Sequence, residues 1–149
     1  MTKVDFYTGS PDKLRTVCQL SHKAMQNGVR AVISVPDLST TDALDKLLWH
    51  YPPSAFIPHC RSNAAAGEMP ASLSDWPVIL DHGGDKFPHH ELLINLHDEC
   101  VPFFSRFERV IEIIGNDEED SRMGRERFKF YRDRGYELHH IDLSKTRNT

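Results

Sequence analysis

Strand-like and helix-like segments alternate through the first 51 residues, and this alternation constrains the fold more than any other feature of the sequence. Short apolar runs at 4–7 and 29–35 predict two strands. Small and apolar residues recur at helical spacing over 14–25 and 43–48, which predicts two helices. The order strand–helix–strand–helix is typical of a parallel sheet covered by helices, so the sequence predicts an α/β fold.

Helix boundaries can also be predicted from residue type. Ser10 is expected to cap the first helix, with Pro11 at its first position and Asp12 in its first turn. Asn27-Gly28 is expected to end this helix, since glycine tolerates the left-handed conformation at a helix end. Ser39 is expected to begin the second helix.

The rest of the chain is predicted to continue the same pattern. Residues 59–75 begin with a small, polar run without a period and are predicted to form a loop. A turn is expected at 81–85. Four further strands are expected at 76–80, 92–96, 109–114 and 136–143, with a short helix near 103–107 and a charged helix at 117–134. We therefore expect one α/β domain over residues 1–143, followed by a polar C-terminal tail at 144–149.

Composition narrows the class of protein. The chain has 149 residues, a charged fraction of 27% and a net charge of −4, which argues against nucleic-acid binding by bulk charge but not against a local basic patch. Its three cysteines are too few for a disulfide scaffold. No segment approaches the roughly 18 apolar residues that span a bilayer. The N-terminal residues hold no signal-peptide core. We expect a cytoplasmic protein that does not contact a membrane.

No motif points to catalysis. The turn at Gly9 lacks both the Gly-x-Gly-x-x-Gly and the Gly-Lys-Ser/Thr pattern of nucleotide sites. Nine histidines are present, but those between His82 and His97 have no spacing typical of metal ligands. We therefore predict no catalytic residue, no metal and no cofactor. A metal-dependent hydrolase that uses these loop histidines, and a nucleotide-binding regulator, remain as alternatives.

The charged helix carries the clearest functional pattern. On a wheel of about 100° per residue, Met123 and Phe130 are predicted to form its core face. Arg125, Lys129 and Arg132 cluster within about 60° on the far side, and Phe128 lies between the two faces. Such a cationic stripe beside an aromatic ring can hold a short acidic peptide that also has an apolar residue. The alternative is a solvated basic face with Phe128 in the core.

A second unusual stretch, at 48–59, concentrates aromatic and proline residues around the end of the second helix. Exposed aromatic side chains of this kind mark surfaces that bind partner proteins. The alternative is that Trp49 and Phe56 pack beneath the following loop.

With these two stretches in this order, the sequence resembles the chi subunit of bacterial DNA polymerase III holoenzyme. The resemblance rests on the order and spacing of several short segments over nearly the whole chain. These segments are Phe6-Tyr7, Leu48-Trp49, Phe56–His59, Pro77-Val78, Leu93–Leu96, Phe107–Val110, Arg125–Arg132 and Gly135-Tyr136-x-Leu138.

The resemblance implies a Rossmann-like three-layer fold, with a mostly parallel central sheet flanked by helices and without enzymatic activity or bound nucleotide. It also implies an adaptor with two partners. One is the acidic C-terminal tail of single-stranded DNA-binding protein, which ends in Pro-Phe. By position, its site would include Arg125, Phe128, Lys129 and Arg132, with Ile114 as a wall of the pocket. Phe128 stands where the family typically has Tyr, so a hydrogen bond from that ring is absent.

The other implied partner is the psi subunit, which links chi to the clamp loader, or another clamp-loader subunit in its place. Carried over by position, this surface would consist of Trp49, Phe56, Pro58 and His59. Contact with DNA would then be mainly indirect, through the protein that coats the single strand.

Overall fold

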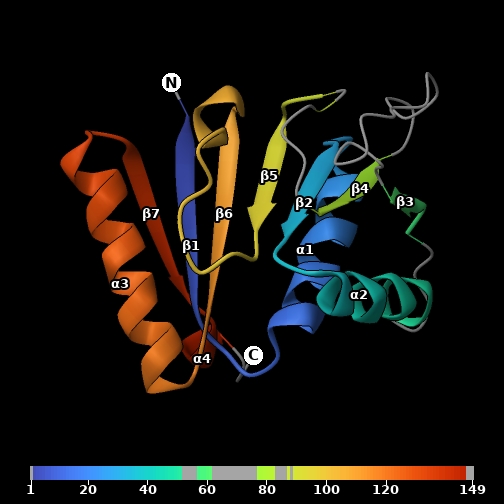
Figure 1. Cartoon of the computed structure of the whole chain (residues 1–149), viewed down its shortest axis with the longest axis horizontal. Helices are drawn as coiled ribbons and strands as arrows, with labels where there is room; N and C mark the ends of the chain where they lie inside the picture. Colours follow the sequence, from blue (N-terminus) through green and yellow to red (C-terminus); the bar gives the residue numbers. More distant parts are fainter. Residues whose placement is uncertain (1, 52–56, 62–76, 83–86, 88, 147–149) are drawn as a thin grey trace.

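The computed structural model describes residues 2–51, 57–61, 77–82, 87 and 89–146 (Figure 1). The described strands form one seven-stranded sheet in the order β3-β4-β2-β5-β6-β1-β7, and every neighbouring pair is parallel. The strand bounds are β1 Lys3–Ser10, β2 Ala31–Val35, β3 His59–Arg61, β4 Val78–His82, β5 Leu92–Asn95, β6 Arg109–Gly115 and β7 Glu137–Asp142.

Helices cover both faces of this sheet. α1 (Lys13–Gln26) and α2 (Leu38–His50) pack on one face, and α3 (Glu118–Asp133) packs on the other, against β6, β1 and β7 (Figure 1). A short 3₁₀ helix spans Phe104–Arg106, and α4 spans Leu143–Thr146. The predicted Rossmann-like α/β fold, with helices on both sides of a parallel sheet, is confirmed.

Side chains alternate between the two faces along each strand, as the two-residue period of a strand requires. Val4 and Phe6 of β1 belong to the apolar core beneath α3, which also contains the buried ring of Tyr131. Tyr7 packs instead against the core beneath α1 and α2. The two faces of β1 therefore serve two separate cores.

The predicted helix caps were wrong by two residues at the start of α1 and of α2. Asp12 caps α1, accepting a hydrogen bond from the backbone of Arg15, whereas Ser10 belongs to β1 and bonds Thr16. Asp37 caps α2 instead of Ser39. In each case an aspartate directly precedes the observed first turn, whereas Ser10 lies two residues before that position and Ser39 lies inside the helix. A carboxylate at the cap position accepts strongly from the free N–H groups of the first turn.

Two predicted connections are partly strands. The predicted loop at 59–75 begins with β3, and residues 62–76 lie outside the described part of the chain. Asp81 and His82, predicted as a turn, complete β4 beside β2. Both differences involve polar residues, which carry no strand period; backbone pairing with a neighbouring strand decided their conformation.

Candidate protein-binding surface

The predicted charged helix is confirmed as α3, and its ends have clear local causes. The side chain of Asp117 accepts a hydrogen bond from the backbone N–H of Asp120 at 2.6 Å. Glu118 and Glu119 lie in the first turn, where acidic side chains favour the positive end of the helix dipole. After the last turn, Gly135 has φ of +79°, a left-handed conformation that glycine adopts without strain.

A glycine lets α3 approach the sheet closely. A Cβ placed on Gly124 would lie 2.3 Å from Cδ1 of Ile114 on β6, much closer than two carbons can pack. Ile114 is only 5% exposed because α3 covers it. The structure therefore places Ile114, the predicted pocket wall, directly beneath Gly124. Gly124 lies one helical turn before Phe128 on α3.

A buried ion pair fixes α3 to the sheet. Glu112 of β6 is fully buried and accepts hydrogen bonds from Arg127 Nε at 2.9 Å and from the hydroxyl of Tyr131 at 2.7 Å. Asn95 Nδ2 donates to the same carboxylate. Burial raises the pKa of Glu112, and the charge of Arg127 opposes that rise. Arg127 also donates to the backbone oxygen of Asp98, so it ties α3 to the segment after β5.

This ion pair changes the core face predicted for α3. Met123 and Phe130 were expected to form that face, but both are only half-buried. The buried positions are Asp120, Gly124, Arg127 and Tyr131. The rotation has a physical cause: the carboxylate of Glu112 under α3 needs a cationic partner, and an apolar face could not supply one.

The outer face of α3 presents the predicted cationic stripe. Arg125 and Lys129 lie one turn apart and are exposed, and neither has a hydrogen-bond or ion-pair partner among the described residues. Arg132 is exposed and lies 3.6 Å from Asp133. Phe128 is half-buried, with its ring packed edge-on against Phe6 at 5.1 Å between centroids. The four residues therefore share one side of the helix, with Phe128 at the boundary of the core.

The other exposed arginines at the ends of this helix already have partners. Arg122 bonds Glu119 and Glu126 along the helix surface. The guanidinium of Arg134 lies 3.6 Å from the centre of the Phe130 ring. Arg125 and Lys129 thus differ from these neighbours in having no described competitor for an incoming anion.

The second predicted surface lies at the opposite end of the sheet, beside β3. Trp49 at the end of α2 is 47% exposed, and its ring lies against that of His59 at 4.6 Å between centroids. His59 is buried, with Nε2 at 2.8 Å from Asp45 and Nδ1 at 2.7 Å from a backbone oxygen. Pro58 is half-buried beside it. Phe56 lies outside the described residues.

Nothing described at the carboxyl edge of β1 and β6 favours the nucleotide alternative. The backbone N–H of Gly115 donates to Asp120 at 2.6 Å, and Lys13 lies 3.2 Å from the same carboxylate. An N–H and a lysine at a strand-to-helix turn are the groups that hold a phosphate. Here an internal carboxylate already occupies both.

The histidines likewise form no described site. Within the described ranges, no group of three or more His, Cys, Asp or Glu residues could hold a metal ion. His97 Nε2 lies 2.9 Å from the hydroxyl of Ser34, and burial lowers the pKa of its ring. No observation on the described residues therefore favours the metal-dependent hydrolase.

The sequence does show that Glu112 needs a buried partner, although it does not show that this partner is Arg127. Glu112 interrupts the apolar run Val110-Ile111-Glu112-Ile113-Ile114, and a charge inside a buried strand requires a partner. The same signal marks Asp5 in the first strand, which pairs with Arg109. Both partners are arginines, a residue type that is normally assigned to the exposed surface when only the sequence is known.

The fold and the surfaces together define an α/β protein with a Rossmann-like sheet and exposed side chains suited to protein contacts. Solved structures agree on the fold. The structure of T4 UvsW matches 95% of this chain and 42% of that chain, with a TM-score of 0.65 at 10% identity. The C-terminal domain of the DEAD-box protein Dbp5 matches 96% of this chain and 91% of that chain, with a TM-score of 0.59 at 13% identity.

Comparison of the amino-acid sequence with known families and proteins identifies the family. Residues 1–139 match the family described as DNA polymerase III chi subunit, HolC. DNA polymerase III subunit chi of Pseudomonas aeruginosa is 34% identical over 142 residues, covering 93% of this chain and 94% of that protein. The subunit chi of Escherichia coli is 26% identical over 123 residues, covering 82% and 80%. The chain belongs to the DNA polymerase III chi subunit family, whose members are accessory subunits in DNA replication.

Proposed function

We propose that this chain is a non-catalytic adaptor of the replicative clamp-loader complex. The outer face of α3 binds the acidic C-terminal tail of single-stranded DNA-binding protein. The exposed surface at the end of α2 binds psi or another clamp-loader subunit. The protein thereby tethers the polymerase machinery to coated single-stranded DNA in the bacterial cytoplasm.

One observation carries the tail-binding proposal: Arg125 and Lys129 are exposed, adjacent and without a described partner, next to the half-buried ring of Phe128. Guanidinium and ammonium groups bind carboxylates, and an aromatic edge packs against an apolar terminal side chain. The helix that presents them is held from below by the buried pair of Arg127 and Glu112. The helix backbone that carries the cations is therefore held in place before the tail arrives.

The charge of the chain agrees with indirect contact with DNA. A net charge of −4 disfavours a long phosphate interface, whose affinity depends on many cations. A short tail buries little area, so an affinity on the order of micromolar is expected. Salt should weaken it, because dissolved ions screen the exposed charges of the tail and of α3.

Fluorescence anisotropy tests this proposal. A labelled acidic peptide that ends in Pro-Phe is titrated with the protein at low and physiological salt, beside the same peptide without its final Phe. Micromolar binding that requires the Phe supports the proposal. Lys129→Glu should abolish binding. Lys46→Glu, the same charge change on an exposed position of α2, should bind like the natural protein. Equal binding by the Lys129→Glu and Lys46→Glu variants would refute the assignment to α3.

The second surface rests on Trp49, a large apolar side chain that is 47% exposed beside the ring of His59. Its test is co-purification with reconstituted clamp-loader subunits. Trp49→Ala should reduce recovery of the complex, whereas Leu38→Ala, at a more exposed apolar position at the other end of α2, should not. The same recovery for both variants would contradict this part of the proposal.

A further inference from the structure

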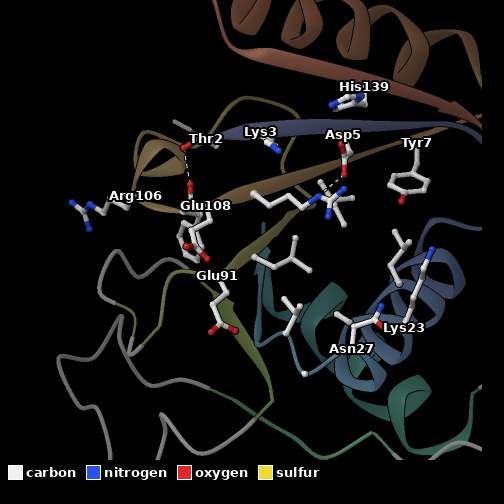
Figure 2. A pocket seen from close by; sticks show the side chains of 18 of the residues that line it. Thr2, Lys3, Asp5, Tyr7, Lys23, Asn27, Glu91, Arg106, Glu108 and His139 are labelled. Carbon is white, nitrogen blue, oxygen red and sulfur yellow. Dashed lines mark hydrogen bonds and ion pairs between the residues drawn. The ribbon is translucent and has the colours of Figure 1, made fainter.

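A hollow lies on the sheet face opposite α3 (Figure 2). It runs along the amino ends of β1, β5 and β6, between the last turn of α1 and the turn at 105–108. Its volume is about 930 Å³. This falls within the roughly 300–1,000 Å³ typical of ligand sites. Neither of the surfaces described above contributes to it.

A pre-oriented guanidinium forms the floor of this hollow. Arg109 Nε donates at 2.7 Å to Oδ2 of Asp5, which is buried and only 2% exposed. The side chain of Arg109 is 58% exposed, and its two terminal nitrogens have no partner among the described residues. Through its two terminal nitrogens, arginine can bind a carboxylate with two parallel hydrogen bonds. Asp5 therefore holds the fork in place and leaves its outer edge open.

The charges around Arg109 favour an anionic group in the hollow. Lys23, on the α1 side of the hollow, is exposed and without a described partner (Figure 2). Glu91 is neutralised by Arg30, whose backbone N–H and guanidinium both bond its carboxylate. Glu108, on the far side, is exposed and adds a negative charge at the rim. A carboxylate at the open edge of Arg109 is therefore favoured. Lys3, Lys23 and Arg106 also line the hollow and add positive charge, whereas Glu108 would repel a phosphate at the rim.

An apolar strip lies next to this position. Tyr7, Leu20 and Ile111 line the hollow, and Tyr7 is half-buried with its ring directed into it (Figure 2). Burial, with the nearby charge of Asp5, raises the pKa of Tyr7, so its phenol stays protonated. The strip offers apolar contact and a hydroxyl donor beside the open edge of Arg109.

We propose that this hollow binds a segment of a partner protein in which an acidic side chain is followed by an apolar one. The carboxylate lies in the fork of Arg109, with Lys23 opposite, and the apolar side chain packs on Tyr7, Leu20 and Ile111. Because strand residues alternate between faces, this site and the cationic stripe of α3 lie on opposite sides of the sheet. Both can be occupied at once, which suits a protein that joins partners.

The experiment is a nuclear magnetic resonance titration of the whole ¹⁵N-labelled protein. The probe is acetyl-Gly-Asp-Leu-Gly-amide, which lacks the final Phe and the free terminal carboxylate of the tail proposed to bind α3. Its control is the same peptide with Asn in place of Asp. At millimolar concentration, the acidic peptide should shift the side-chain Nε–Hε signal of Arg109 and the amides of Tyr7 and Ile111. The Asn peptide should not.

Variants separate this site from α3 and from the fold itself. Arg109→Lys keeps the charge over Asp5 but loses the fork, and should weaken binding about tenfold. Lys23→Gln alters only an exposed side chain and should weaken it several-fold, which keeps the test decisive if Arg109→Lys unfolds. Lys129→Glu should leave the shifts unchanged.

Four results would overturn the proposal: no shifts in the hollow, equal shifts with the Asn peptide, shifts that persist unweakened in the Lys23→Gln variant, or stronger shifts of the same signals by a twelve-residue oligo-dT. The last result would assign the hollow to nucleic acid. A failure of the α3 tail site in anisotropy would leave this titration unaffected, because the probe differs and the variants that test the hollow, Arg109→Lys and Lys23→Gln, lie outside α3.

Discussion

Replacing Arg127 with Met tests how α3 is held, because Arg127 is 3% exposed and its partner Glu112 is fully buried. Methionine replaces the methylene groups of the arginine side chain with an apolar chain of similar length. The carboxylate of Glu112 is then left with only Asn95 and Tyr131 as hydrogen-bond donors. Breaking a buried ion pair by removing one partner costs about 3–5 kcal/mol. Net stabilities are about 5–15 kcal/mol, so the variant should lose a large share of its free energy of unfolding.

The assay is urea unfolding at pH 7, followed by circular dichroism, for Arg127→Met, Glu112→Gln and the double variant. Glu112→Gln removes the buried charge while keeping an acceptor for Tyr131. Because each single change leaves one charge unpaired, the double variant should lose about 2–3 kcal/mol less than the sum of the two. Additive losses, or a cost below about 1 kcal/mol for Arg127→Met, would refute this account of α3.

The same variant has a predictable pH dependence. Burial raises the pKa of Glu112, and in Arg127→Met the opposing charge is gone, so the pKa should rise further. The folded variant then takes up a proton at pH values where the unfolded chain, with a glutamate pKa of about 4.3, does not. Its stability deficit should therefore shrink as the pH falls from 7 toward 5. A deficit that is constant or grows over this range would contradict the assignment.

Three further predictions follow from local contacts. Gly124→Ala forces Cβ against Ile114; overpacking costs about 1–3 kcal/mol. The gain in helix propensity is about 1 kcal/mol, so the melting temperature should fall, and a rise would contradict the close packing. Asp120→Ala leaves the N–H of Gly115 without its acceptor and should cost about 1–3 kcal/mol by urea unfolding; an unchanged midpoint would refute the role of that carboxylate. Partial burial raises the pKa of Cys100 to about 11, so iodoacetamide should modify it at least about tenfold more slowly than glutathione at pH 7.5; equal rates would contradict the raised pKa of this half-buried thiol.

The architecture was predictable because apolar periodicity is strong where elements are buried on one or both faces. The mostly apolar segment from Leu92 to Leu96 predicts a fully buried strand, and β5 is buried between β2 and β6. Polar segments have no apolar periodicity from which a strand could be predicted. The first residues of the predicted 59–75 loop pair with β4 as an edge strand, and only the position of β4 in space determines that pairing.

The candidate site was predictable in its exposed half but not in its buried half. Helical spacing alone places Arg125 and Lys129 on one face, and both are exposed as expected. The inner face was predicted wrongly because a hydrophobic wheel treats every arginine as surface. Arg127 is buried instead, because Glu112 on β6 needs a cation, and which strand residue lies under a helix depends on tertiary packing.

The measurement that tests the central claim most directly is an amide-resolved titration of the ¹⁵N-labelled protein with an unlabelled acidic peptide that ends in Pro-Phe. The account predicts that the largest shifts fall on α3 at Arg125, Phe128 and Lys129, and on Ile114 beneath it, and that they disappear in the Lys129→Glu variant. Largest shifts on α2 or in the hollow around Arg109, with α3 unmoved, would contradict it.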